Sequence, residues 1–186
     1  MKKVNFLKQL ACFCLGCLPA ANSYAIDVSG TINVNGVNRI FIIHAPGTSI
    51  DVNLPVVLIF HGDGGTAAGM KNTTYGFDAV ADANNFMAVY CQSTNDIGPG
   101  EWNKIADGDE TGAPQDVLYI SNLIDYLCST YYINRKRVYA TGMSGGAFFA
   151  YRLAIELAHK IAAIAPVSGS LWGPEDPPNT FLDDYP

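Results

Sequence analysis

The sequence is short of histidine, of basic residues and of long apolar runs. It has 3 histidines, and 11 lysines and arginines against 17 aspartates and glutamates, so its formal net charge is −6. An acidic chain is repelled by a phosphate backbone, so we expect no nucleic acid partner. No apolar run reaches the roughly 20 residues that a membrane-spanning helix needs, so no membrane span is expected. The residues are 49% hydrophobic and 15% charged, which excludes a disordered chain and predicts one globular domain.

The first 25 residues have the composition of a secretory signal peptide. Three lysines make a basic start, and the apolar stretch LACFCLGCLPAA follows. Ser23 and Ala25 then supply the small residues of a cleavage site. We therefore expect a secreted or periplasmic protein whose folded domain covers residues 26–186. The alternatives are a buried N-terminal helix and a lipid anchor on a cysteine of this segment.

Cysteine is scarce in the rest of the chain, where only Cys91 and Cys128 remain. A secretory compartment permits disulfides. However, Cys91 ends a predicted strand, and Cys128 lies near the end of a helix predicted to begin around Pro114. The two residues should therefore lie at opposite edges of the sheet, roughly 20 Å apart. A disulfide needs Cα atoms within about 7 Å, so we expect both thiols to stay free.

Strands and helices alternate along most of the domain. Residues 28–47 alternate apolar and polar side chains around Asn35-Gly36, which is a strong signal for an antiparallel hairpin. Beyond it, strands are predicted at 56–60, 86–91, 137–141 and 161–169, and helices at 67–85, 114–132 and 146–159, with Gly76 a weak point in the first helix. This order predicts an α/β domain with a mostly parallel sheet and helices on both faces.

A serine lies between glycines where a predicted strand meets a predicted helix, in the sequence Gly142-Met143-Ser144-Gly145-Gly146. A sharp strand-to-helix turn strains the backbone of such a serine and lifts its hydroxyl above the sheet. The turn also leaves the Gly145 N–H at a helix N-terminus, where it can stabilise an oxyanion. Ser144 is therefore the candidate nucleophile. The alternative is a glycine-rich turn without chemistry.

The loop His61-Gly62-Asp63-Gly64-Gly65 follows the first buried strand. A nucleophile on such a turn needs a second N–H donor, and in this architecture the loop supplies it. The best donor is the backbone N–H of Asp63, with Gly64 next. Because a negative charge near an oxyanion is costly, we expect the Asp63 carboxylate to point away or to bond a backbone N–H locally. The alternative is a simple turn.

Two tryptophans could line a binding site. Trp102 lies in the long loop after residue 91, and Trp172 follows the last predicted strand. Both should lie at the carboxyl edge of the sheet, where α/β proteins bind ligands. They could hold an aromatic or sugar group, or they could pack within their loops. No metal or organic cofactor is implied by the sequence.

The segments FHGDGG, WN, DVLYISNLIDYL and INRKRVYATGMSGGAFFAYRLAIELAHKIAAIAPVSGSL follow one another in the chain. Together they resemble the secreted α/β-hydrolases known as polyhydroxybutyrate depolymerases and feruloyl or acetylxylan esterases. The resemblance implies an α/β-hydrolase fold and a serine carboxylesterase that forms an acyl-enzyme on Ser144, with the N–H groups of Asp63 and Gly145 as the oxyanion hole. It implies as substrate an ester of plant polysaccharide or a hydroxyalkanoate polyester.

The resemblance also places a triad acid and histidine after further strands, beyond Pro186. None of the histidines present suits a general base for Ser144. His44 is expected to be exposed on an edge strand, His61 to shape the oxyanion loop, and His159 to lie about 20 Å away at the far end of a helix. We therefore expect a fragment that lacks the last strands of the sheet and is inactive alone. The alternative is a natural short protein without catalysis.

Two other functions remain open at the level of sequence. A serine peptidase of the prolyl-oligopeptidase kind uses a similar elbow around its serine, although such enzymes usually carry a large additional domain. A non-catalytic carbohydrate-binding protein would need no base.

Overall fold

The computed structural model describes residues 25–47, 53–73, 76–94, 100–104 and 115–171. The expected signal peptide and Trp172 lie outside these residues. Within them, the strands are β1 (Ile26–Val34), β2 (Val37–Ala45), β3 (Val56–Phe60), β4 (Met87–Cys91), β5 (Val138–Met143) and β6 (Ala163–Val167). The helices are α1 (Ala67–Lys71), α2 (Phe77–Asn84), α3 (Asp116–Thr130) and α4 (Gly145–Glu156).

The strands form one mixed sheet with the order β1-β2-β4-β3-β5-β6. Strand β2 pairs antiparallel with both β1 and β4, and the other neighbouring strands run parallel. The predicted hairpin is confirmed, because Asn35 and Gly36 connect β1 to β2 with φ angles of 49° and 89°. Two positive φ angles are what a two-residue hairpin turn requires. The sheet is therefore mostly parallel, with an antiparallel N-terminal hairpin.

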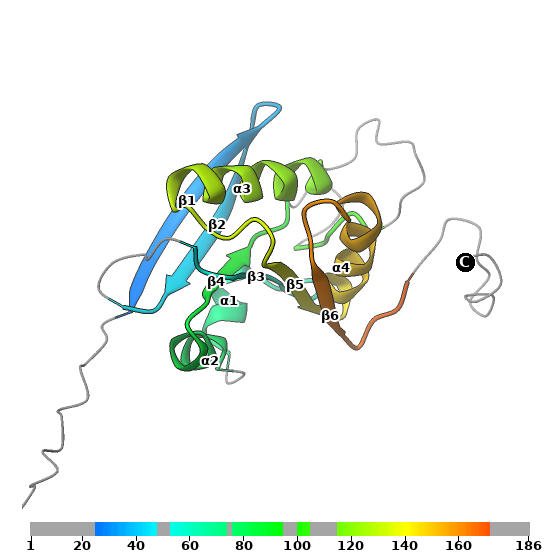
Figure 1. Ribbon diagram of the computed structural model, residues 1–186. Coiled ribbons are helices and arrows are strands. Elements are labelled where there is room, and N and C mark those ends of the chain that lie inside the picture. Colours follow the sequence, from blue (N-terminus) through cyan, green and yellow to red (C-terminus); the bar gives the residue numbers. More distant parts are fainter. Residues whose placement is uncertain (1–24, 48–52, 74–75, 95–99, 105–114, 172–186) are drawn as a thin grey trace, which may run out of the picture.

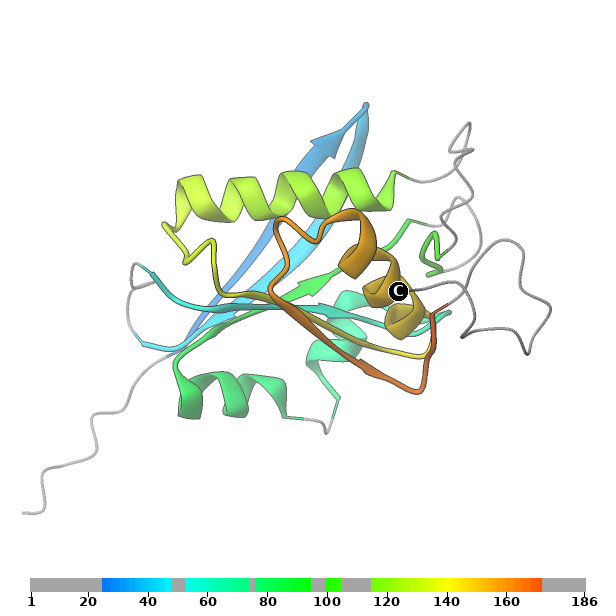
Figure 2. The ribbon, with the colours of Figure 1, turned by 45° about the vertical axis from the view of Figure 1, so that its right-hand side comes forward.

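Helices cover both faces of the sheet, as the alternation of elements predicts. Helices α3 and α4 lie on one face, and α1 and α2 lie on the other (Figure 1, Figure 2). Strand β4 is buried along its whole length because it lies between these two layers, which explains its uninterrupted apolar sequence. In the described part of the chain, no helix is long and apolar enough to cross a membrane.

The helix predicted over residues 67–85 is divided in two. Helix α1 ends at Lys71, and α2 begins after Gly76, which has a φ of 66°. A glycine adopts this left-handed conformation without the steric cost that other residues meet, so it can interrupt a helical pattern. The prediction of free thiols is confirmed for Cys91 and Cys128, which are both buried and unpaired. Burial raises the pKa of the Cys91 thiol to about 12, so this thiol stays protonated.

The expectation that His44 is exposed on an edge strand is wrong. Strand β2 has a neighbour on each side, and only 5% of His44 is exposed. Its Nδ1 lies 2.8 Å from Asp27 Oδ1, and its Nε2 lies 3.1 Å from Asp82 Oδ1. The Lys71 ammonium pairs with the carboxylates of Asp27 and Asp78 in the same cluster. This cluster therefore joins β1, β2, α1 and α2, and a lysine already supplies its cation.

Candidate active site

Ser144 occupies a sharp turn between β5 and α4. Its φ and ψ angles are 53° and −120°, an unfavourable conformation for a residue with a side chain, and Ser144 is exposed. Its N–H donates to the Val167 carbonyl of β6 over 3.0 Å, which holds the turn in place. The flanking glycines are needed for close packing. A Cβ on Gly142 would lie 2.5 Å from the Gly146 carbonyl carbon, and one on Gly146 would lie 2.4 Å from Phe60 O.

The loop after β3 lies directly against this turn. A Cβ on Gly62 would lie only 3.5 Å from Ser144 Cβ. The Gly65 N–H donates to Gly62 O over 2.9 Å and closes the loop, and Gly64 has a φ of 75°. Among the described residues, no acceptor is found for the backbone N–H of Asp63 or of Gly145. Two unpaired donors are therefore present beside an exposed serine hydroxyl.

The Asp63 carboxylate does not follow the sequence-based expectation. It neither points away from the turn nor bonds a local N–H. A Cβ on Gly145 would lie 2.0 Å from Asp63 Oδ1, so the carboxylate lies against the first residue of α4. Its other oxygen, Oδ2, accepts a hydrogen bond of 2.7 Å from Lys104 Nζ. The negative charge beside the turn is thus compensated by a lysine that the sequence analysis did not single out.

Lys104 is held near the turn by the residue before it, Asn103. The Asn103 N–H donates to Asp116 Oδ2 over 2.7 Å, and the Asn103 carbonyl accepts a 3.1 Å bond from Arg152 Nη1. The buried Asp116 also forms an ion pair with Arg39. A short segment of the long loop is therefore anchored to both α3 and α4. The only sequence signal for it is a lysine that directly follows the WN motif.

Trp102 lies in the core and has no exposed surface. Its ring stacks on Phe149 with centroids 4.8 Å apart and packs nearly perpendicular to the Phe60 ring. Its Nε1–H donates to His61 O over 2.9 Å. This placement fits the packing alternative, because a fully buried indole offers no face to a ligand. Trp102 therefore supports the loop after β3 through His61.

The three histidines all lie in described residues, and none of them hydrogen-bonds Ser144. His61 is buried, with Nδ1 2.8 Å from Gly62 O and Nε2 accepting from the Ser93 N–H over 3.3 Å. Burial lowers the pKa of His61, so its imidazole is neutral. Its two hydrogen bonds tie the loop after β3 to the segment after β4. His159 is exposed beyond the C-terminus of α4, whose N-terminus carries the serine. None of these three side chains is therefore placed to act as a general base for Ser144.

The amino-acid sequence is similar to those of known esterases and polyester depolymerases. A bifunctional acetylxylan esterase/xylanase of Neocallimastix patriciarum is 31% identical over 134 residues, which cover 72% of this chain and 18% of that protein. Poly(3-hydroxyalkanoate) depolymerase C of Paucimonas lemoignei is 28% identical over 151 residues, 81% of this chain and 36% of that protein. The chain thus spans less than half the length of these curated relatives.

Solved structures agree on the fold. An acetyl xylan esterase from Aspergillus awamori superposes with a TM-score of 0.62 at 21% identity, covering 76% of this chain and 53% of that one. A ferulic acid esterase gives a TM-score of 0.60 at 14% identity, covering 77% and 59%. The predicted α/β-hydrolase fold is confirmed. The model of the family described as Esterase PHB depolymerase matches residues 40–180. The chain therefore belongs to the polyhydroxybutyrate depolymerase family of esterases.

Proposed function

We propose that Ser144 is the nucleophile of a secreted serine carboxylesterase. The observation that carries the proposal is the strained, exposed Ser144, with the unpaired N–H groups of Asp63 and Gly145 on the two segments that meet there. A glycine-rich turn without chemistry would have no reason to keep a serine at a φ of 53°. Strain of this kind persists where it positions a reacting group.

The chemistry follows from these groups. The Ser144 hydroxyl loses its proton to a general base and attacks the carbonyl carbon of an ester. The carbonyl oxygen becomes an oxyanion, which the N–H groups of Asp63 and Gly145 stabilise, and the helix N-terminus of α4 adds a favourable dipole. The alcohol leaves with a proton, and an acyl group remains on Ser144. Water then attacks the acyl-enzyme, releases the carboxylic acid and restores the serine.

We infer the substrate class of this protein from the names of its relatives. Their names specify acetylated xylan for one and poly(3-hydroxyalkanoate) for the other. We therefore propose an ester of a plant polysaccharide, with an acetyl or feruloyl acyl group, or a hydroxyalkanoate polyester. Export to the polymer, which cannot enter a cell, is consistent with the signal peptide expected in residues 1–25.

Replacing the serine tests the proposal. In the full-length protein, Ser144→Ala should lower kcat/KM for p-nitrophenyl acetate by at least about 10³-fold, because the nucleophile is lost. Ser129→Ala on α3 is the matched control, since the Ser129 hydroxyl only bonds the Tyr126 carbonyl on the surface. The control should hydrolyse the ester as the unchanged protein does. Retained activity in Ser144→Ala would overturn the assignment.

A further inference from the structure

The loop after β3 carries the Asp63 N–H, one of the two proposed oxyanion donors, and a short segment lies against this loop. Lys104 Nζ donates to Asp63 Oδ2 over 2.7 Å. Two positions earlier in the chain, Trp102 Nε1–H donates to His61 O over 2.9 Å. The side chains of Lys104 and Trp102 therefore reach the same loop from one segment, residues 100–104, which we call the loop brace.

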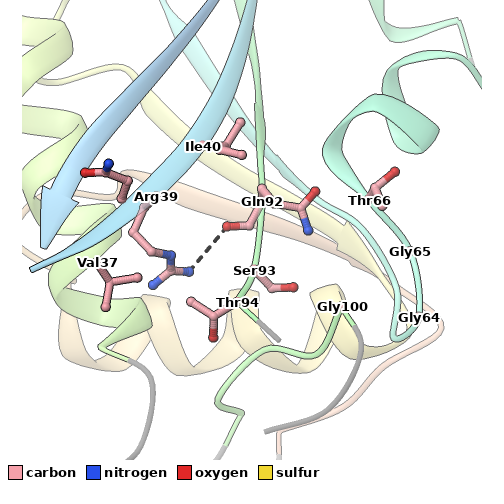
Figure 3. Close-up of a pocket in the computed structure, with 11 residues that line it drawn as sticks. Val37, Arg39, Ile40, Gly64, Gly65, Thr66, Gln92, Ser93, Thr94 and Gly100 are labelled. Carbon is pink, nitrogen blue, oxygen red and sulfur yellow. Dashed lines mark hydrogen bonds between the residues drawn. The ribbon is translucent and has the colours of Figure 1, made fainter. Parts of the chain in front are cut away.

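The loop brace also meets the loop through its backbone. A Cβ on Gly100 would lie 2.4 Å from Gly65 O and 3.2 Å from the Gly64 carbonyl carbon. Figure 3 shows these three glycines in the wall of one cavity. A close contact between two backbones cannot be relieved by a change of side-chain rotamer. A displacement of the brace would therefore displace the loop.

The brace is anchored at Asn103, which lies between Trp102 and Lys104. The Asn103 N–H donates to Asp116 Oδ2 over 2.7 Å, and the Asn103 carbonyl accepts from Arg152 Nη1 over 3.1 Å. Both anchoring residues are buried, with 1% of Asp116 and 4% of Arg152 exposed. Asp116 is the first residue of α3, and Arg152 lies in α4. Both backbone groups of one residue are thus held by buried charged side chains of two helices.

Asp116 forms a buried ion pair with Arg39 of β2. The Arg39 guanidinium also donates to Gln92 O over 3.3 Å (Figure 3). Burial raises the pKa of the Asp116 carboxyl, and the charge of Arg39 limits this rise. Replacing a buried ion pair by packed apolar residues is often neutral for stability, so stability alone does not account for the pair. A carboxylate at this place has a geometric effect, because it fixes the Asn103 N–H.

We propose that Asp116 and Arg152 are positioning residues of the esterase site. Through Asn103 and the loop brace, they fix the Asp63 N–H near the serine turn. An oxyanion donor must lie about 2.7–3.1 Å from the oxyanion, and a misplacement of about 1 Å can cost about 10²-fold in rate. The proposal rests on the proposed esterase function, because it concerns a group that would stabilise the oxyanion. It adds two buried charged side chains that lie outside the serine turn and the loop.

Hydrolysis of p-nitrophenyl acetate by the full-length protein tests the proposal. Asp116→Asn keeps the size of the side chain and removes the charge that strengthens its bonds to Arg39 and Asn103. We expect kcat per active site, counted by titration with a fluorophosphonate, to fall at least about tenfold, with KM changing less than about twofold. Arg152→Met removes the donor to Asn103 O and should act in the same direction. Arg152→Lys keeps a donor and should lose less activity.

Glu156→Gln is the matched control for Arg152. Glu156 Oε1 accepts from Arg152 Nε, so this variant removes the charge pair and leaves the bond from Arg152 to Asn103 in place. It should retain kcat. Asp116→Asn combined with Arg152→Met should be about as active as the poorer single variant, because both act through Asn103. Unchanged kcat per active site in both single variants, or a combined loss equal to the product of the single losses, would overturn the proposal.

Hydrogen exchange followed by mass spectrometry separates this proposal from the esterase function, because it requires no hydrolysis. Loop amides exchange by local opening, so Asp116→Asn and Arg152→Met should speed exchange in residues 61–65 at least about threefold. Leu127→Ala, which opens a cavity in the core farther along α3, should not. Faster exchange in a protein that hydrolyses no ester would contradict the esterase and retain the positioning of the loop. Hydrolysis that depends on Ser144, with exchange and kcat unchanged in both variants, would retain the esterase and overturn the positioning role.

Discussion

Lys104 supplies a positive charge to the Asp63 carboxylate, which lies against Gly145 of the proposed oxyanion hole. Without Lys104, this carboxylate would disfavour a second negative charge on a bound oxyanion. The Lys104 side chain is 17% exposed and that of Asp63 is 38% exposed, so solvent only partly screens the pair. We therefore expect the ion pair to adjust the electrostatics of the proposed oxyanion hole without involving its two N–H donors. Lys104 is a positioning residue in this sense, since it acts through Asp63.

Replacing Lys104 should slow the chemical step. Lys104→Met should lower kcat for p-nitrophenyl acetate about tenfold with little change in KM, because the uncompensated carboxylate destabilises the oxyanion more than the bound ester. Lys104→Arg should retain most of the activity. Steady-state kinetics on the purified full-length variants measures both values.

A double variant distinguishes this effect from simple damage to the loop. Asp63→Asn removes the charge and keeps the backbone N–H, so Lys104→Met should cost little activity in that background. A double-mutant cycle measures the difference. If Lys104→Met costs the same activity with Asp63 and with Asn at that position, the ion pair has no electrostatic role in catalysis.

Residue-level features were the least predictable from the sequence. Lys104 and Asp63 are 41 positions apart, and only the folded loop brings them together. The same is true of His44, whose burial depends on β2 having a partner on each side. Local pattern rules describe neighbours in the sequence and carry no information on such pairs. Ser144 was different, because its glycines, the strand before it and the helix after it are all local.

At the scale of elements, the turn between β5 and α4 is packed without spare room. A Cβ on Gly146 would lie 2.4 Å from Phe60 O and 2.6 Å from His61 O, and both oxygens belong to the backbone. Backbone atoms cannot rotate away as the end of a side chain can. The close approach therefore fixes α4 against the end of β3, and with it the distance between the serine and the oxyanion loop.

Gly146→Ala should force these two elements apart. We expect the free energy of unfolding to fall by about 1–3 kcal/mol, the usual cost of overpacking, and kcat for p-nitrophenyl acetate to fall as the oxyanion donors move away from Ser144. Urea denaturation and steady-state kinetics measure the two effects. Unchanged values for both would contradict the close packing at this glycine.

The elements themselves were largely predictable. The Asn35-Gly36 hairpin and the buried strands β3 and β4 follow from period and composition, which depend only on local sequence. The sequence predicts one helix over residues 67–85 with a weak point at Gly76, whereas the structure has two helices, α1 and α2. Periodicity continues across such a break, because one residue in a left-handed conformation changes the chain direction without changing the apolar pattern.

At the scale of the whole molecule, the neutral buried His61 makes stability depend on pH. Burial lowers its pKa in the folded state, while the unfolded chain takes up a proton near the ordinary value of about 6.5. As the pH falls below that value, protonation favours the unfolded chain. The free energy of unfolding should therefore decrease with falling pH below about 6.5, by at most about 1.4 kcal/mol per pH unit from this group.

Urea denaturation between pH 7 and pH 5.5 measures this dependence. His61→Gln, which keeps hydrogen-bonding capacity but does not titrate, should flatten the slope in that window. The two proteins differ only at residue 61, so the difference between their slopes reports on His61 alone. Equal slopes for the two proteins would mean that His61 is not responsible.

The turn that presents Ser144 also has a consequence for the kinetics of folding. Its contacts join parts of the chain that are distant in sequence, because Gly146 packs on Phe60 and the Ser144 N–H donates a hydrogen bond to Val167 O. Contacts between residues far apart in sequence close large loops and form slowly, whereas helices form from local contacts. During refolding, the active-site geometry should therefore be restored only when β3, β5 and β6 have aligned, so that helical signal recovers first and esterase activity afterwards.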